Sequence, residues 1–369
     1  MNILHICSNY IGTKVHLNQV TSLANTVEKQ NVIVPVFSRD HINRNNTSLE
    51  SVNVSYFKIN NTILKYFPLI KTVAVFLYIL FKYNDKVKES NLIYSHTLWS
   101  NGLPAYLLSL CFRKRLIISI RSTDFFVFMK KLPHYRWIMR LIIHRAEKVI
   151  FISPSYKDKV MTDYNKLFSD TDKCLVIPNG IDNFWIEKTK SPLAEKKSIS
   201  DGKSFIFVAR LNKTKRLELT IDILIEIRKN NLYKNSTLTI IGCSEKEVLS
   251  YLKIEKLPSW IIIKDIVQSK DTLFNIYSAS HALILLSYQE TFGLVYLEAL
   301  ASGCPVVLTK QEGISGYFSQ CDSILEVDTS NVKLIASNII KMPDFEFPRY
   351  ENISKFSWQN YAKEIEKIL

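Results

Sequence analysis

The chain of 369 residues has few cysteines and no long apolar segment free of polar residues. Its six cysteines are scattered and form no Cys-x-x-Cys pair. They therefore indicate small buried residues in a reducing compartment, not a disulfide or metal framework. The uncharged segment 90–112 contains several polar residues and a proline, and 72–81 is far shorter than the ~20 apolar residues that a membrane span needs. We expect no transmembrane helix.

Other absences narrow the class of protein further. The sequence has no internal repeat and no low-complexity tract, and its 47% apolar content is that of a globular protein and not of a disordered one. Met1 leads directly into an apolar strand pattern, so we expect no signal peptide and a cytoplasmic location. The length allows two domains with full cores.

Basic residues are concentrated in the first half of the chain, whose formal net charge as a whole is +14. Residues 1–185 carry 24 Lys and Arg against 12 Asp and Glu, whereas residues 186–369 carry 24 against 22. The asymmetry indicates an anionic partner for the first half, namely a membrane surface, a nucleic acid or an acidic substrate, or else a solvated basic surface. Nucleic acid is the less favoured partner, because no recognised binding motif accompanies the charge.

Apolar strand patterns alternate with helical patterns along both halves. This alternation is typical of βαβ units and predicts an α/β fold with two Rossmann-like domains and a cleft between them. The segment 183–203 is rich in Lys, Ser and Pro, lacks sustained periodicity, and is the predicted linker. The predicted strands are 2–7, 32–37, 92–94, 116–120, 148–152 and 174–177 in the first half, and 204–208, 237–241, 260–264, 282–286 and 305–308 in the second.

A strand, a loop and a helix start follow one another within residues 282–308. The apolar run 282–286 leads into a turn with Gly293, where a helical pattern begins, and another apolar run follows. In α/β proteins this order holds phosphorylated ligands, because free N–H groups and the helix dipole attract the anion. Glu290 and Glu298 lie around the turn, and a carboxylate on the helix can accept hydrogen bonds from ribose hydroxyls. The alternative is that both are exposed carboxylates flanking a helix.

Two cations follow the first strand of the second half. The strand 204–208 brings Arg210 to its C-terminal end, and Lys215 lies five residues later in the loop before a helix. Two fixed cations beside a helix N-terminus suit a diphosphate and would stabilise one that leaves. Upstream, the sequence Val-Ile-Pro-Asn-Gly-Ile-Asp at 176–182 ends the first half with a strand and a tight turn.

In combination, these motifs resemble those of retaining glycosyltransferases of the GT-B fold, in glycosyltransferase family 4 of the bacterial surface-polysaccharide type. The resemblance is carried by the Glu-x7-Glu segment, by the strand with Arg210 and Lys215, and by the Pro-Asn-Gly-Ile-Asp turn at 178–182, in matching order and spacing. It covers nearly the whole chain, and its specific motifs lie within residues 176–307.

The resemblance implies a domain organisation. Residues 1–185 would form an acceptor-binding domain and residues 186–355 a domain that binds the nucleotide-sugar, the two facing each other across a cleft. A C-terminal helix at about 356–369 would return to the first domain.

The resemblance also implies roles for the motif residues. Arg210 and Lys215 would bind the donor diphosphate, and Glu290 would contact the transferred sugar. Glu298 would hold the ribose hydroxyls. The backbone of three consecutive residues would cap the phosphates: Phe292, Gly293 and Leu294. Family members displace the leaving group on the front face with retained configuration, and the leaving phosphate helps deprotonate the acceptor, so no enzymic nucleophile and no metal are expected.

The first half departs from the family at two places. A Gly-Gly pair commonly follows the first strand, but the loop here has only Gly12, which we expect on the acceptor side together with His96 and Arg121. A histidine usually ends the strand at 116–120, but Arg121 occupies that position and Asp124 lies three residues further on. Either residue could act on the sugar or acceptor, or the two could simply pair with each other. His96, also at a strand end, is either an acceptor-side residue or a core histidine.

Two further segments have competing interpretations. The Asp-x-Asp sequence at 170–172 lies in a polar loop and predicts a solvated turn, so we expect no metal site there. The basic and aromatic segment 125–145 places Arg136, Arg140 and His144 on one helix face. That composition suits an anionic bilayer, where each Lys or Arg contributes about 1 kcal/mol, although a packed helix with a solvated face is the alternative. The segment 69–82 is similar and more apolar.

These observations predict a hexosyltransferase at the inner face of the cell membrane. It would be a peripheral protein held by its basic N-terminal domain, and it would move a sugar from a nucleotide donor, UDP in preference to GDP, onto a lipid-linked glycan for surface polysaccharide. The alternatives are a GT-B enzyme with a soluble sugar or sugar-phosphate acceptor, and a non-catalytic paralogue kept for binding.

Overall fold

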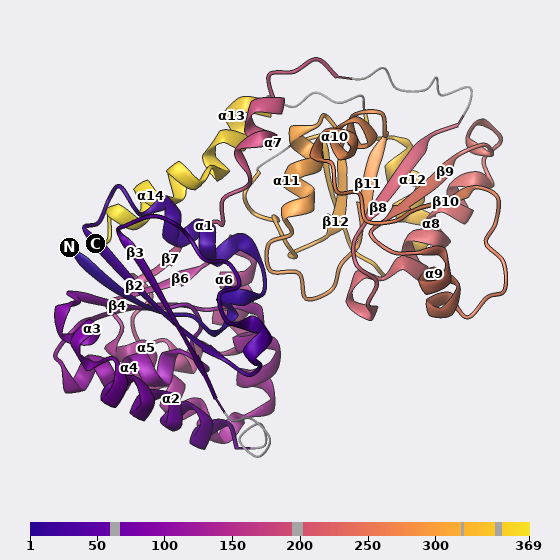
Figure 1. Cartoon of the computed structure of the whole chain (residues 1–369). Helices are drawn as coiled ribbons and strands as arrows, with labels where there is room; N and C mark the ends of the chain where they lie inside the picture. The colour runs from indigo at the N-terminus through magenta and orange to yellow at the C-terminus, as the bar shows by residue number, and fades with distance from the viewer. Residues whose placement is uncertain (60–66, 194–201, 319–320, 344–348) are drawn as a thin grey trace. The chain divides into compact units, whose positions relative to one another are not determined.

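The chain folds into two compact units, each built on a parallel sheet (Figure 1). The first unit comprises Met1–Gly180 and Trp358–Leu369, and the second comprises Ile181–Ser357. The two sheets confirm the predicted α/β fold with two Rossmann-like domains. The computed structural model describes residues 1–59, 67–193, 202–318, 321–343 and 349–369.

The division between the units differs from the predicted linker at 183–203. The chain passes between units at Gly180, and residues 183–188 already form helix α7 (Asn183–Lys188). The helix starts there because the Asp182 side chain accepts a hydrogen bond from the Phe184 N–H at 3.0 Å and caps it. This short helix was not predicted, because the segment 183–203 is rich in Lys and Ser and lacks sustained periodicity. Residues 194–201 of the predicted linker lie outside the described part of the chain.

The sheet of the first unit contains seven strands that all pair in parallel. In spatial order they are β3 (Val52–Lys58), β2 (Lys29–Val36), β1 (Asn2–Ile6), β4 (Leu92–Ser95), β5 (Arg115–Ser119), β6 (Lys148–Phe151) and β7 (Cys174–Val176). The strands read as apolar runs because helices cover both faces of the sheet. Strand β3 was not predicted, although Val52, Val54 and Tyr56 alternate with polar residues, as an edge strand should.

Helices cover the two faces of this sheet (Figure 1). On one face α2 packs beside α4, and α4 packs beside α5; on the other, α1 packs beside α14. The helices of the unit are α1 (Lys14–Ser22), α2 (Pro68–Lys82), α3 (Asn84–Glu89), α4 (Gly102–Cys111), α5 (Arg136–Arg145), α6 (Pro154–Asp163) and α14 (Trp358–Glu366). None of the helices in the described ranges is long and apolar enough to cross a bilayer.

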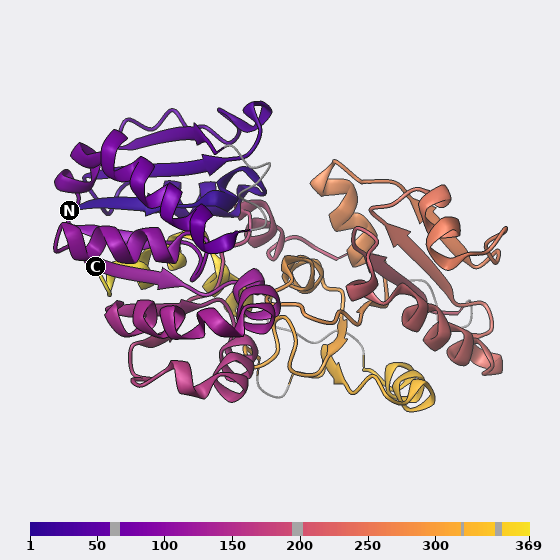
Figure 2. The same cartoon turned by 90° about the horizontal axis from the view of Figure 1, so that it is seen from below.

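The C-terminal helix completes the core of the first unit, as expected. Tyr361, Ala362 and Ile365 of α14 are buried in the same cluster as Ile3 of β1 and Ile117 of β5. The two chain termini therefore lie side by side at one end of this unit, as both views show (Figures 1 and 2). The chain returns to its first sheet after completing the second unit.

The sheet of the second unit contains six strands, again parallel. In spatial order they are β10 (Ile261–Lys264), β9 (Thr237–Ile241), β8 (Ser204–Val208), β11 (Ala282–Leu285), β12 (Val306–Thr309) and β13 (Ile324–Val327). The helices besides α7 are α8 (Leu217–Arg228), α9 (Glu245–Leu252), α10 (Lys270–Ser278), α11 (Leu294–Ala301), α12 (Val332–Ile340) and α13 (Arg349–Ile353). The order reverses beside β8, so the loops after β8 and β11 lie next to each other, where such sheets bind ligands.

Candidate functional site

The loop after β8 is held against the loop after β11. The Asn212 side chain accepts a hydrogen bond from the Thr214 N–H at 2.9 Å, which forms a tight turn around Lys213–Lys215. The Thr214 carbonyl in turn accepts a hydrogen bond from the Tyr288 N–H at 2.7 Å. This contact joins two segments that are 74 residues apart in the sequence. It fixes Lys215 opposite Glu290.

Lys215 and Glu290, both predicted donor-site residues, form an ion pair. Lys215 Nζ lies 2.6 Å from Glu290 Oε2, and the two side chains are 22% and 16% exposed. The other carboxylate oxygen of Glu290 accepts a weaker hydrogen bond from the Phe292 N–H at 3.4 Å. Because both groups are largely shielded, the pair is a fixed feature of the site and not a mobile surface contact.

Helix α11 begins at a turn that requires a glycine, and a second glycine, in the loop after β12, packs against this turn. Gly293 has φ +74°, and a Cβ built there would lie 2.5 Å from the Tyr296 ring. Gly313 has φ +58°, and its Cβ would lie 2.9 Å from the same ring. The ring cannot withdraw, because the Tyr296 hydroxyl donates to the Leu285 carbonyl at 2.8 Å. Leu294 is the first residue of α11, and the Phe292 side chain is buried.

Glu298 lies on α11 and is mostly buried. Burial raises the pKa of its carboxyl from 4.5 to about 7, and the nearby Asp182 carboxylate adds to the rise, while Lys270 opposes it. Asp182 also forms an ion pair with Lys270. A carboxyl that is half protonated at neutral pH gains most from a ligand that donates hydrogen bonds to its ionised form. Sequence reasoning missed Lys270, for which no local signal exists.

Arg210 lines a cavity of about 590 Å³ at the ends of β8, β9 and β10. Its other lining residues are Leu211, Gly242, Cys243, Ser244, Glu247, Asp265 and Ile266. Gly242 has φ +103°, and Ser244 and Glu247 form a capping box at the start of α9. Sequence reasoning missed this cavity, although a glycine directly after a strand and a Ser-x-x-Glu sequence were visible signals.

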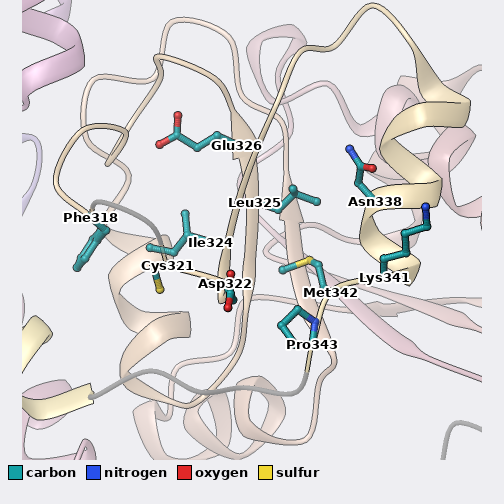
Figure 3. Close-up of a pocket in the computed structure, with 10 residues that line it drawn as sticks. All are labelled: Phe318, Cys321, Asp322, Ile324, Leu325, Glu326, Asn338, Lys341, Met342 and Pro343. Carbon is teal, nitrogen blue, oxygen red and sulfur yellow. The ribbon is translucent and has the colours of Figure 1, made fainter.

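A second pocket lies at the other edge of the same sheet, beside β13 and the end of α12 (Figure 3). Its volume is about 480 Å³, and Lys341 is the single basic residue among the described residues that line it. None of the predicted site residues takes part. Without paired cations it does not suit a diphosphate.

Gly12 in the first unit does not have the geometry that demands glycine. It follows the short helical turn Ser8–Ile11 with φ −76°, and a Cβ built there would meet the Asn9 carbonyl oxygen at 3.4 Å, an ordinary contact. Gly12 and Gly293, both predicted site residues, therefore differ in whether a side chain would fit.

The Asp124 side chain is fully buried, and its carboxylate accepts hydrogen bonds from backbone N–H groups, not from the Arg121 guanidinium. Its carboxylate accepts hydrogen bonds from the N–H groups of Leu98 at 2.9 Å, Trp99 at 3.0 Å and Arg121 at 2.9 Å. Burial raises its pKa to about 6, and these bonds moderate the rise. Among the described residues no ion pair joins the Arg121 side chain to Asp124, so the expected alternative, a simple pair, occurs only through the Arg121 backbone.

His96 belongs to a buried chain of hydrogen bonds whose protons can be assigned. The Gln30 amide nitrogen donates to the Val20 carbonyl, so its oxygen accepts from His5 Nε2 at 3.1 Å. His5 Nδ1 is then the acceptor for His96 Nε2–H, also at 3.1 Å. His96 Nδ1 is left as a buried lone pair with no partner among the described residues. His96 is thus a core histidine with one unused acceptor.

A second chain of polar contacts leads from α1 to Arg121. His16 Nδ1 donates to the Gln19 amide oxygen at 2.9 Å, and Gln19 Nε2 donates to Asn179 Oδ1 at 3.1 Å. The same Asn179 oxygen accepts from Arg121 Nη1 at 3.3 Å. Asn179 belongs to the Pro-Asn-Gly-Ile-Asp turn at 178–182. This turn therefore orients the Arg121 side chain.

The histidines of these chains are neutral near pH 7. Burial lowers the pKa of His5 to about 4 and that of His16 to about 3, and it holds the pKa of His96 well below its usual range. The Arg121 charge lowers the pKa values of His16 and His96 further. Burial also raises the pKa of the Cys7 thiol to about 12. Arg121 therefore carries the charge of this cluster.

In the described part of the chain, one group of side chains has the spacing of metal ligands. The Cys7 sulfur and one ring nitrogen each of His16 and His96 lie within 4.8 Å of one another. Asp170 and Asp172 do not belong to such a group. Both are exposed, and the Asp170 carboxylate accepts from the Asp172 N–H at 3.0 Å, as in a solvated turn.

Family models match both halves of the chain. Residues 190–364 match the model described as "Glycosyl transferases group 1", and residues 18–183 match "Glycosyltransferase Family 4". An uncharacterized glycosyltransferase of Methanocaldococcus jannaschii is 26% identical over 301 residues, which is 75% of this chain and 74% of that protein.

Solved structures share the fold at low sequence identity. The apo form of the lipopolysaccharide outer core galactosyltransferase WaaB has a TM-score of 0.70 and 18% identity, and the match covers 100% of this chain and 98% of that one. Anabaena HepE in complex with UDP and glucose has a TM-score of 0.65 and 16% identity, over 100% and 99%. These likenesses confirm the GT-B architecture.

Proposed function

We propose that this glycosyltransferase transfers a sugar from UDP-sugar to a lipid-linked glycan with retained configuration. The matches to the family 4 model at 18–183 and to the group 1 model at 190–364 support transfer of a sugar. UDP is the preferred nucleotide because the similar HepE was solved with UDP. The galactosyltransferase that shares the fold acts on lipopolysaccharide outer core, according to its description. Surface polysaccharide synthesis is the matching role.

The observation that carries this proposal is the Lys215–Glu290 ion pair. The pair lies beside the Gly293 turn that starts α11, where backbone N–H groups and the helix dipole favour phosphate. A diphosphate bound there would give Lys215 a second anionic partner and leave Glu290 able to accept hydrogen bonds from the sugar. Arg210 would bind the same diphosphate, and the cavity that it lines would hold the base.

The proposed reaction needs these cations and no resident metal. The bond between the anomeric carbon and the diphosphate oxygen breaks, and the acceptor oxygen bonds to the same face of that carbon. The proton of the acceptor hydroxyl passes to the leaving diphosphate. Arg210 and Lys215 offset the charge that develops on the diphosphate, which is the work that a divalent cation does in other phosphate sites. Glu298 would hold the ribose hydroxyls.

Transfer by a Glu290→Gln variant tests the donor site. We expect kcat to fall about 10²–10³-fold, as when one transition-state contact is lost, with UDP affinity nearly unchanged because Glu290 meets the sugar. Glu255→Gln, at an exposed position of the same unit, is the matched control and should transfer normally. A wild-type protein that binds UDP but neither transfers nor hydrolyses any UDP-, GDP- or ADP-sugar would instead be the non-catalytic paralogue.

The proposed acceptor class rests on a face of the first unit that is both apolar and basic. Phe81 of α2 is 78% exposed and Trp137 of α5 is 64% exposed, and Leu110 of the intervening α4 is exposed as well. Lys82 and Arg140 lie on the same helices and are also exposed. Large apolar side chains among basic ones suit the surface of an anionic bilayer.

Vesicle binding tests this membrane face. The wild type should sediment with anionic phosphatidylglycerol vesicles at low salt and less so as salt rises, because screening shortens the range of the attraction. The double variant Phe81→Ser/Trp137→Ser should lose binding, whereas Leu232→Ser, a 70% exposed position in the second unit, should not. Indifference of the wild type to these vesicles, together with turnover of a free sugar, would establish the soluble-acceptor alternative.

A further inference from the structure

The Arg121 guanidinium lacks a counter-ion within its unit. Within the described part of the chain, its one side-chain hydrogen bond is to the neutral Asn179 amide, and its Nε is buried without a partner. No carboxylate of the described part of this unit lies within ion-pair distance. A shielded cation without a counter-ion is costly, and the cost falls when an anion binds.

The Asp124 carboxylate is not available as a counter-ion for the Arg121 guanidinium. Both of its oxygens accept backbone N–H groups, from Leu98 and Arg121 at one oxygen and from Trp99 at the other. Turning the carboxylate toward the guanidinium would leave buried N–H donors without acceptors. The cation therefore keeps its charge available at the carboxyl end of β5.

The positive charge of Arg121 also influences which kind of ligand the neighbouring cluster of side chains can bind. Cys7, His16 and His96 have the spacing of metal ligands, but the Arg121 charge acts on all three side chains. A divalent cation among them would be repelled by the guanidinium, whereas an anion would be attracted. The cluster favours an anionic ligand over a metal ion.

We infer that Arg121, oriented by Asn179 and Gln19, binds a phosphate group of the acceptor. This inference rests on the proposed function, because it assigns the acceptor to the first unit. A guanidinium presents several N–H donors in a plane and suits phosphate oxygens better than any other side chain does.

The phosphate has two possible sources, which share this chemistry. It is either the diphosphate of a lipid-linked sugar or the phosphate of a soluble sugar phosphate. Calorimetric titration of the full chain, saturated with UDP so that the donor site is filled, distinguishes them with three probes: farnesyl diphosphate, glucose 1-phosphate and the neutral octyl glucoside. We expect one of the two phosphates to bind, and the neutral glucoside to bind at least about tenfold more weakly.

Two substitutions show whether Arg121 is responsible. Arg121→Gln should weaken binding of that phosphate at least about tenfold and leave octyl glucoside unaffected. Asn179→Asp is the sharper variant, because it keeps an oxygen for both Gln19 and Arg121 but supplies an internal counter-ion 3.3 Å from the guanidinium. It should weaken phosphate binding as much as Arg121→Gln does while preserving the fold.

The outcomes separate this inference from the proposed function. Normal UDP binding, with phosphate binding that is absent or equally strong in the wild type and both variants, would overturn the role of Arg121 and leave the donor site standing. Absence of UDP binding by the wild type would contradict the proposed function itself. Loss of phosphate affinity in both variants, with UDP affinity retained, supports the inference.

Discussion

The two units differ in how the cations of their candidate sites are neutralised. In the second unit, Lys215 pairs with Glu290 in a largely shielded contact, and the more exposed Lys270 pairs with Asp182. In the first unit the polar cluster at the sheet edge consists of neutral histidines and amides around a single guanidinium, Arg121, which has no carboxylate partner in the described part of that unit.

This difference indicates two kinds of ligand site. A site with preformed ion pairs is oriented before the ligand arrives, as a transition-state site must be, because its dipoles do not need to reorganise during the reaction. A lone cation held by an amide is a receptor for one anion and is neutralised only when that anion binds. Under the proposed function, the second unit would carry out the chemistry on the donor and the first would select the acceptor.

Replacing Lys215 should have the largest effect and tests the second unit directly. Lys215→Met removes one cation from the leaving diphosphate and leaves Glu290 largely shielded and unpaired, so we expect a loss of about 2.7–4 kcal/mol of transition-state stabilisation. The measurement is kcat/KM for sugar transfer. Lys213→Met, in the same turn but exposed, is the control. Equal effects of the two variants would mean that general loop charge, and not the ion pair, matters.

Replacing Asp124 tests whether this residue has a structural or a catalytic role in the first unit. Asp124→Asn cannot offer two acceptor oxygens, so at least one buried N–H of Leu98, Trp99 or Arg121 loses its partner, at a cost of about 1–3 kcal/mol. Hydrogen exchange in the strands of the first unit should speed up accordingly, and UDP binding by the second unit should persist. A drop in kcat without faster exchange would instead restore Asp124 to a catalytic role.

Substituting one glycine in each unit tests whether the backbone at each position requires glycine. Gly293→Ala forces a Cβ against the Tyr296 ring at positive φ and should cost about 1–3 kcal/mol and weaken UDP binding. Gly12→Ala, at φ −76° with only ordinary contacts, should leave both stability and transfer within experimental error. Denaturant unfolding of each variant, with UDP titration, checks both expectations. Comparable losses would show that the Gly12 loop has a close contact with substrate.

The sequence predicted the second unit's site better than the first's. Glu290 and Gly293 belong to one strand–loop–helix pattern, and Lys215 belongs to another, after β8. In both, local periodicity marks the strand and the helix that border the loop. The contact that joins them, from Tyr288 to Thr214, follows from β8 and β11 being neighbours in the sheet. A parallel sheet makes such neighbours predictable once its strands are known.

The polar cluster of the first unit could not be predicted in the same way. Gln19 and Gln30 come from different elements, and neither has a local signal that distinguishes it from an ordinary surface amide. Asn179 lies in the motif turn at 178–182, but nothing in that motif indicated its contact with Arg121. Their importance arises from burial, which only the packing of α1 on the sheet creates. In the same packing, Asp124, for which a role at the sugar or acceptor is predicted, accepts hydrogen bonds from the backbone N–H groups of Leu98, Trp99 and Arg121.

The pH dependence of UDP binding is the smallest expected effect and tests how Glu298 is tuned. Burial raises its pKa to about 7, so the carboxylate that accepts the ribose hydrogen bonds is fully formed only above neutral pH. UDP affinity of the wild type should therefore rise between pH 6 and pH 8, by up to about tenfold. Glu298→Gln should show a flatter dependence; the diphosphate's own titration is common to both proteins and cancels in the comparison.

The same shift fixes the sign of a stability effect in the ligand-free protein. Because the folded-state pKa of Glu298 lies above its unfolded value of 4.5, the protonated form stabilises the fold below pH 4.5, and this contribution is lost as the pH rises through about 7. Glu298→Gln should thus be no more stable than the wild type at pH 4 and more stable at pH 8. Parallel stability curves for the two proteins would mean that the Lys270 charge offsets both the burial of Glu298 and the repulsion from Asp182.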